Sequence, residues 1–127
     1  MSFLNNMFGS SNDTTTSKVD WRLLTDLGQL NEIIQESIEK PVVIFKHSTR
    51  CYISKSALKQ FENEFDLQEK IIPYFLDLLE HRDISNEITN RFGIEHQSPQ
   101  LILIKEGKAV YDASHESIDA SKLEQFV

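Results

Sequence analysis

The chain has 127 residues, of which 39% are hydrophobic and 26% charged, and these proportions are typical of one water-soluble globular domain. Thirteen basic and twenty acidic side chains give a net charge of −7, which disfavours general binding to nucleic acid or to an anionic membrane. No apolar stretch approaches the roughly 20 residues that cross a bilayer, and a single cysteine excludes both an internal disulfide and a cysteine-based zinc site.

The N-terminal segment has few side chains that could be buried. Residues 9–17, GSSNDTTTS, are small and polar, so burial cannot offset the entropy cost of ordering their backbone. We therefore expect a flexible tail over residues 1–17 and one folded domain over residues 18–127.

The first half of the domain alternates between helical and apolar patterns. Residues 21–40 predict a short extended piece followed by a helix. Thr25 or Asp26 would cap this helix, and Pro41 would end it. The run VVIF, residues 42–45, is uninterrupted and β-branched, which is typical of a strand covered on both faces.

The helices on either side of this strand are each expected to have one apolar side. In the first helix the inward positions would be Leu27, Leu30, Ile33, Ile34 and Ile38. In the second helix, which follows the loop KHSTR, they would be Ile53, Ala57, Leu58, Phe61 and Phe65.

A further strand and helix follow. The apolar run after the second helix predicts a strand centred on residues 74–79. The stretch DISNEITNRFG then predicts a helix. Its N-cap would be Asp83 or Ser85, and Gly93 would stop it.

The C-terminal part predicts a hairpin and a last helix. Residues 99–115 contain two strands around a Lys-Glu-Gly-Lys turn. Residues 116–127 predict a helix, and its inward positions would be Ile118, Leu123 and Phe126. The element order (β)αβαβαββα therefore indicates an α/β fold: a central mixed sheet of four to five strands with helices on both faces.

Cys51 follows the strand of residues 42–45 by a short loop and lies at the first turn of the next helix. The unpaired N–H groups and the positive end of the helix dipole stabilise a thiolate relative to a thiol there. Positive charge close by in the sequence comes from Lys46, His47, Arg50 and Lys55. The alternative to a reactive thiolate is a buried cysteine that only fills space in the core, as most free cysteines do. The flanking Arg50 and the pair Ser48–Thr49 argue against that environment, because polar groups beside a buried thiol need their own partners.

Ser54 stands three residues after Cys51, where a redox motif would carry a second cysteine. A Cys-x-x-Ser unit cannot close an internal disulfide. It can still attack a mixed disulfide and hold a small thiol until another thiol removes it. A serine in this place is equally suited to bond a backbone N–H of the first helical turn.

Ser98–Pro99 precedes the expected strand QLILI. A cis peptide at this place would turn the preceding backbone outward, where it could pair with an extended substrate. An ordinary trans proline at the start of a strand is the alternative, and base rates favour it.

The pattern resembles a known fold and, more narrowly, a known family. Strand, Cys-x-x-Ser, helix, strand, helix, proline, hairpin and helix resemble the thioredoxin fold, and residues 88–115 look like its cis-proline and hairpin half. PVVIFKHSTRCYIS, residues 41–54, is similar to the monothiol bacilliredoxins of the bacillithiol system, which carry FKHST-x-C-x-I-S. The resemblance runs from about Trp21 to the C-terminus and is most specific over residues 46–54.

This resemblance implies a monothiol thiol–disulfide oxidoreductase that removes a small thiol, bacillithiol, from mixed disulfides on client proteins. Cys51 would be the attacking thiol. Bacillithiol would be a co-substrate, and no cofactor or metal would be needed. We further expect a cytoplasmic monomer whose partners are S-thiolated proteins and the small thiol. The supporting and substrate-binding residues would be Thr49, Arg50, Ser54, Lys55, Ser98 and Pro99.

Each supporting residue has an expected role. Arg50 and Lys55 would attract carboxylates on the small thiol. The backbone of Ser98 would align the substrate strand, and Ser54 or Thr49 would donate a hydrogen bond to sulfur.

Some positions depart from thioredoxins. Tyr52 stands where many such motifs have proline or glycine, Phe45 replaces their buried acid, and Arg50 replaces their tryptophan. Gly107 stands alone where glutaredoxins have a glycine pair. These departures exclude a thioredoxin-type dithiol cycle and argue against glutathione binding in the glutaredoxin manner.

Two other functions fit parts of the pattern. Ser48-x-x-Cys51 imitates the peroxidatic motif of thiol peroxidases, although the preceding loop lacks their proline. A Cys-x-x-Ser protein can also be a binding module, either one that shares an Fe–S cluster with a small thiol or a non-catalytic adaptor.

Overall fold

The structure is a computed structural model that describes residues 18–127, so the tail expected over residues 1–17 lies outside the described residues. The described part of the chain forms one five-stranded mixed sheet. Its strands are β1 (Arg22–Leu23), β2 (Val42–His47), β3 (Ile72–Asp77), β4 (Gln100–Lys105) and β5 (Lys108–Ser114). Their order across the sheet is β1-β3-β2-β4-β5, with β1, β3 and β2 parallel and β4 and β5 antiparallel to their neighbours.

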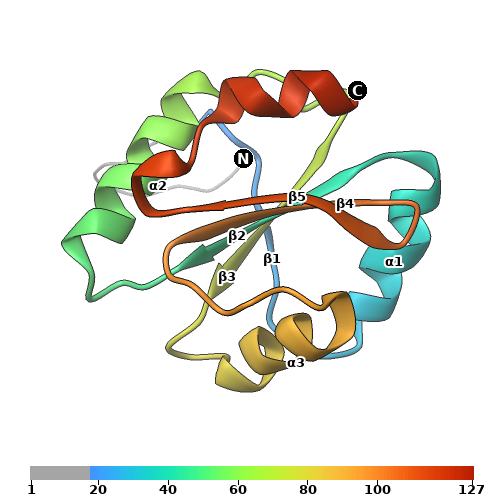
Figure 1. Cartoon of the computed structure of the whole chain (residues 1–127), viewed down its shortest axis with the longest axis horizontal. Coiled ribbons are helices and arrows are strands. Elements are labelled where there is room, and N and C mark those ends of the chain that lie inside the picture. The colour runs from blue at the N-terminus through green and yellow to red at the C-terminus, as the bar shows by residue number, and fades with distance from the viewer. Residues whose placement is uncertain (1–17) are drawn as a thin grey trace, which may run out of the picture.

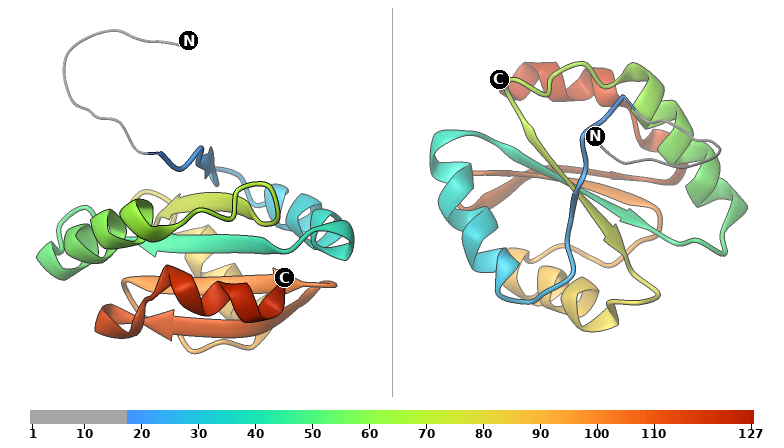
Figure 2. Two further views of the ribbon diagram at one scale, coloured as in Figure 1. Left: turned by 90° about the horizontal axis from the view of Figure 1, so that it is seen from above. Right: turned by 180° about the vertical axis from the view of Figure 1, so that it is seen from behind.

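Helices cover both faces of this sheet, as the sequence predicted (Figures 1 and 2). They are α1 (Gln29–Glu39), α2 (Tyr52–Glu64), α3 (Arg82–Phe92) and the 3₁₀ segments η2 (His115–Ser117) and η3 (Ala120–Phe126). Figure 1 shows α2 and η3 above the sheet and α1 and α3 below it. The predicted α/β architecture, a central mixed sheet with helices on both faces, is therefore confirmed.

The core divides into two apolar layers, one on each side of the central strand β2. Successive strand residues point to opposite faces, so Val42 and Ile44 pack with α1 and α3, whereas Val43 and Phe45 pack with α2 and η3. Both sets are fully buried. The continuous apolar run of the sequence thus reflects a strand covered on both faces, and it fixes the loop that follows β2 at the edge of the sheet.

The N-cap predictions were wrong at α1. Gly28 is the N-cap, and α1 begins at Gln29. The side chain of Gln29 folds back, and its Oε1 accepts hydrogen bonds from the N–H groups of Thr25 and Asp26 at 2.7 and 2.9 Å. The chain before α1 is therefore held by a glutamine inside the helix, and not by the two residues predicted to cap it.

The N-cap predictions were also wrong at α3. His81 is the N-cap, and the helix starts at Arg82, upstream of the predicted Asp83 and Ser85. Ser85 is buried against the sheet side of the helix. The predicted stop is confirmed, because Gly93 adopts the left-handed conformation with φ of 67° that ends a helix at low cost.

Other expectations need correction. The last segment is not one α-helix: Lys122 donates to the carbonyl of Asp119, the i→i+3 pattern of a 3₁₀ helix. Leu27, Ile38 and Ile53, which were predicted to face inward, are 42%, 58% and 50% exposed. In α1 the buried side chains are confined to a narrow stripe, and in α2 the residue at position 53 lines a surface groove described below.

Candidate functional site

Cys51 is the N-cap of α2, in the loop that leaves the carboxyl end of β2. Its N–H donates to the carbonyl of Ser48 at 3.2 Å, and its own carbonyl accepts the N–H of Lys55 at 3.1 Å, which closes the first helical turn. The thiol is free and partly exposed. The start of α2 therefore holds the thiol at the carboxyl end of β2, where solvent can reach it.

Ser54 lies beneath this loop and is fully buried. Its Oγ accepts the N–H of Ser48 at 3.0 Å and forms a second hydrogen bond with Nδ1 of His47 at 2.8 Å. Within residues 18–127 no group forms a hydrogen bond with the sulfur of Cys51, so the predicted donation from Ser54 or Thr49 is absent from this structure. Ser54 instead fixes the loop that carries the cysteine.

His47 was expected to add positive charge near Cys51, but the structure makes it a buried hydrogen-bond partner of Ser54. It is buried at the end of β2, and burial lowers the pKa of its imidazole, a shift that the nearby Asp77 carboxylate opposes. The ring is therefore neutral at pH 7 and can bond to Ser54 without burying a charge. The sequence predicted His47 to lie in the loop because it is polar. Its hydrogen-bond partner Ser54 is seven residues away, so the pattern around His47 gave no sign that its side chain is buried and bonded.

We expect Ser54→Ala to lower the free energy of unfolding by about 1–3 kcal/mol, because it leaves the Ser48 N–H and the His47 ring without a partner. Urea unfolding would show this as a lower midpoint at an unchanged slope. Ser56→Ala, an exposed serine on the same helix, is the matched control and is expected to stay within about 0.5 kcal/mol of the wild type. Equal effects of the two variants would contradict the bonding role of Ser54.

A polar cavity lies on one side of the Cys51 loop. It is lined by Thr49, Arg50, Asp77, Leu79, Glu80 and Arg82. Arg50 and Arg82 are exposed, and neither guanidinium forms an ion pair with any residue of the described part of the chain. Arg82 is the first residue of α3, where the helix dipole disfavours a cation. Two carboxyl groups, those of Asp77 and Glu80, line the same cavity, so its cationic and anionic side chains are equal in number.

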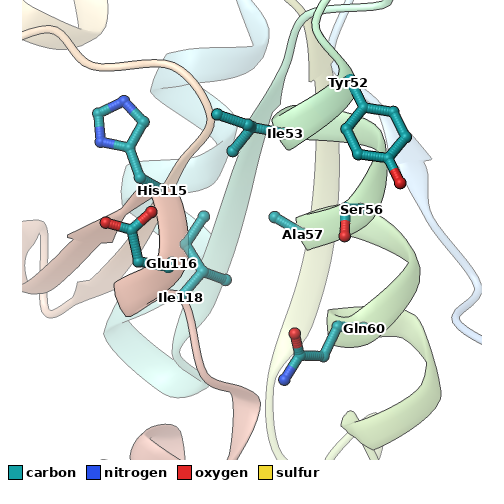
Figure 3. A pocket seen from close by; sticks show the side chains of 8 residues that line it. All are labelled: Tyr52, Ile53, Ser56, Ala57, Gln60, His115, Glu116 and Ile118. Carbon is teal, nitrogen blue, oxygen red and sulfur yellow. The ribbon is translucent and has the colours of Figure 1, made fainter.

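A groove lies on the other side of the loop, between the first turns of α2 and the segment η2 (Figure 3). It is lined by Tyr52, Ile53, Ser56, Ala57, Gln60, His115, Glu116 and Ile118. Tyr52 is 83% exposed and Ile53 half exposed, beside the cysteine itself. Lys55, a predicted site residue, lines neither the groove nor the polar cavity; it is exposed on α2.

The Ser98–Pro99 peptide is cis. Because β4 runs antiparallel to β2 and starts at Gln100, these two residues lie at the same edge of the sheet as the loop of Cys51. The carbonyl of Pro99 accepts the N–H of His115 at 3.1 Å, which ties the segment to the wall of the groove. The Oγ of Ser98 is buried and forms no hydrogen bond within residues 18–127.

The structure thus brings most of the predicted residues to one edge of the sheet. Thr49, Arg50 and Cys51 share one loop, and Ser98 and Pro99 lie at the same edge. Arg82 was missed because it is distant in sequence. The signal that could have found it is its place after the carboxyl end of a strand parallel to β2, the end at which α/β sheets bind ligands.

No helix among the described residues is both long and apolar enough to span a membrane. The sequence profile of the family described as monothiol bacilliredoxin BrxC matches residues 22–123. One solved structure, a protein with a thioredoxin fold for which an oxidoreductase activity is proposed, is 32% identical, with a TM-score of 0.70 over 81% of this chain and 89% of that one. Thioredoxin from Malassezia sympodialis is 22% identical, with a TM-score of 0.66 over 90% and 93%. Thioredoxin from Fasciola hepatica is 18% identical, with a TM-score of 0.64 over 83% and 94%.

Proposed function

The chain belongs to the monothiol bacilliredoxin family and is a thiol–disulfide oxidoreductase, and we propose that it removes bacillithiol from mixed disulfides on client proteins, with Cys51 as nucleophile. The observation that supports this most directly is the free, partly exposed thiol at the start of α2. The position that could hold a resolving cysteine is instead a buried serine, Ser54.

The reaction has two exchange steps. The Cys51 thiolate attacks the bacillithiol sulfur of the protein mixed disulfide. A new disulfide forms between Cys51 and bacillithiol, the old one breaks, and the client leaves as a thiolate that takes a proton from water. A second bacillithiol thiolate then attacks the same bacillithiol sulfur, which frees Cys51 and yields oxidised bacillithiol. The client thiol is reduced, and two molecules of bacillithiol supply the electrons.

The second step needs an external thiol because the chain contains one cysteine. An internal disulfide, which would release the small thiol by itself, is impossible. The bound intermediate must therefore remain open to solvent on at least one side. Cys51 is partly exposed, and its neighbours Arg50 and Tyr52 line the polar cavity and the groove, which fits this requirement.

The two surfaces beside Cys51 suit the two halves of the substrate. Arg50 and Arg82 in the polar cavity would bind carboxylates of the small thiol, because guanidinium groups favour carboxylate partners. The groove with Tyr52 and Ile53 would take side chains of the client protein, and the backbone of Ser98 would pair with the client strand.

Parallel release assays test the proposal. One client protein is loaded at a single cysteine with bacillithiol, glutathione or coenzyme A, and the chain is added with the matching free thiol. We expect bacillithiol to be released at least about tenfold faster than the other two, since only differential binding near the reacting sulfur separates them. Intact mass should then show one bacillithiol adduct on the chain.

The uncatalysed exchange in the same buffer is the control for these assays. Release of all three thiols at the uncatalysed rate would refute the proposed function. If the chain accelerates the release of all three thiols equally, it is still an oxidoreductase, but bacillithiol is not its preferred substrate. Consumption of peroxide in place of disulfide exchange would favour the thiol peroxidase alternative.

A further inference from the structure

Lys46 is a buried cation that the proposed mechanism does not use. It lies in β2, its side chain is completely buried, and no carboxylate of the described residues forms an ion pair with it. Burial lowers the pKa of its ammonium to about 8. Taking an unpaired charge out of water is costly, and an apolar side chain of the same length would avoid the cost. The presence of lysine here therefore calls for a role other than stability.

The partners of Lys46 lie on both sides of the segment that contains the cis peptide. Its Nζ donates to Nδ1 of His96 at 2.8 Å and to Oε1 of Gln100 at 3.3 Å. A lysine ammonium can only donate, so Nδ1 of His96 is the acceptor. Burial and the charge of Lys46 lower the pKa of His96, which keeps the ring neutral and able to accept. One ammonium thus bonds to the residues just before and just after Gln97, Ser98 and Pro99.

The side chain of Gln100 also forms hydrogen bonds with the backbone of this segment. Its Oε1 also accepts the N–H of Gln97 at 3.3 Å, and its Nε2 donates to the carbonyl of Glu95 at 3.1 Å. The side chain of Ser98, in contrast, has no hydrogen-bond partner among the described residues. The shape of the segment is therefore fixed by its neighbours and not by Ser98 itself.

We propose that Lys46 is a positioning residue that holds the backbone of Ser98 and Pro99 in the conformation that pairs with a client protein strand. This inference rests on the proposed function, because it concerns how the client binds. Lys46 does not touch the reacting sulfur. It acts through His96 and Gln100 and affects the peptide part of the substrate more than the small thiol.

Two substrates distinguish an effect on the binding of the peptide from an effect on the binding of the small thiol. One is an extended peptide with a single bacillithiolated cysteine, and the other is the mixed disulfide of bacillithiol and 2-mercaptoethanol, which has no peptide strand. We expect Lys46→Met to raise the KM for the peptide about tenfold, as for a loss of binding shared by ground state and transition state, with little change in kcat. The KM for the small disulfide should stay within about twofold. Lys108→Met, an exposed lysine on β5, is the matched control.

His96 provides a second test, because it is exposed and its replacement leaves no cavity in the core. Its Nδ1 also lies 3.4 Å from the Oγ of buried Ser85, so urea unfolding of each His96 variant is measured alongside. His96→Ala is expected to raise the peptide KM in the same direction as Lys46→Met, and the double variant should be no worse than Lys46→Met alone, since Lys46→Met already removes the Lys46–His96 hydrogen bond. His96→Gln keeps an acceptor near the Lys46 ammonium and is expected to lie closer to the wild type than His96→Ala.

An unchanged ratio of the two KM values in His96→Ala or in folded Lys46→Met would overturn the positioning role, as would additive effects in the double variant. If Lys46→Met does not fold, the His96 variants decide the question alone. The proposed function fails separately: a wild-type protein that accelerates exchange with neither substrate refutes it. An active wild type with an unchanged ratio refutes only the role of Lys46.

Discussion

Cys51→Ala is expected to lower the rate of bacillithiol release from a client protein by at least about a thousandfold, because it removes the nucleophile and no other thiol exists in the chain. The remaining side chains can bind the substrate, but they cannot break its disulfide. Release is measured by the mass of the client over time, with free bacillithiol supplied in excess. The intact mass of the variant should show no bacillithiol adduct.

Cys51→Ser is the closest replacement in shape and is expected to be as inactive as Cys51→Ala, because a serine hydroxyl is far less nucleophilic than a thiolate at neutral pH. Lys108→Met, remote from this edge of the sheet, should release bacillithiol at the wild-type rate. A Cys51→Ala protein that retains a tenth of the wild-type rate would show that the client and free bacillithiol exchange on the surface of the protein without a covalent intermediate.

Features encoded by neighbouring residues could be predicted from the sequence. The run of residues 42–45 has β-branched side chains on both faces, and Gly93 is the residue type that a left-handed helix end favours. Cys51 was placed at a helix start from the same local pattern, and the structure makes it the N-cap of α2. In each case the deciding interactions lie within a few residues of the chain.

Features that depend on distant partners could not be predicted. Lys46 and His47 looked like loop because they are polar, yet both belong to β2 and are buried. Lys46 bonds to His96, which is 50 positions away, and this partner appears only when β4 lies beside β2. Arg82 was missed for the same reason, since β3 brings it to the loop of Arg50 only in the folded sheet.

Lys46 also gives the largest expected effect of pH on stability. The pKa of its ammonium is lowered from 10.5 to about 8, so between these values the unfolded chain binds a proton that the folded chain does not. The free energy of unfolding should therefore rise with pH across this range, by up to about 3 kcal/mol in total. Below about pH 8 both states carry the proton, and the full cost of burying the charge is present.

A comparison of the wild type with Lys46→Met isolates the contribution of the Lys46 ammonium to the pH dependence of stability. Tyr74 and Tyr111 have pKa values raised by burial, so they destabilise the fold above pH 10, but they do so in both proteins and cancel in the difference. The pKa values of His47 and His96 are lowered from 6.5 by burial, and that of His96 also by the charge of Lys46, so both histidines act mainly at the acid end of the measured range. Urea unfolding at several pH values from 7 to 10.5, with Lys108→Met as control, gives the difference directly.

We expect Lys46→Met to be more stable than the wild type at pH 7 and to lose this advantage as the pH approaches 10.5. A difference that stays constant over this range would show that the lysine is solvated in the folded protein and that its charge carries no burial cost. A more stable variant that binds client peptides more weakly would show that the buried charge lowers stability and, through His96 and Gln100, gives the substrate segment its shape.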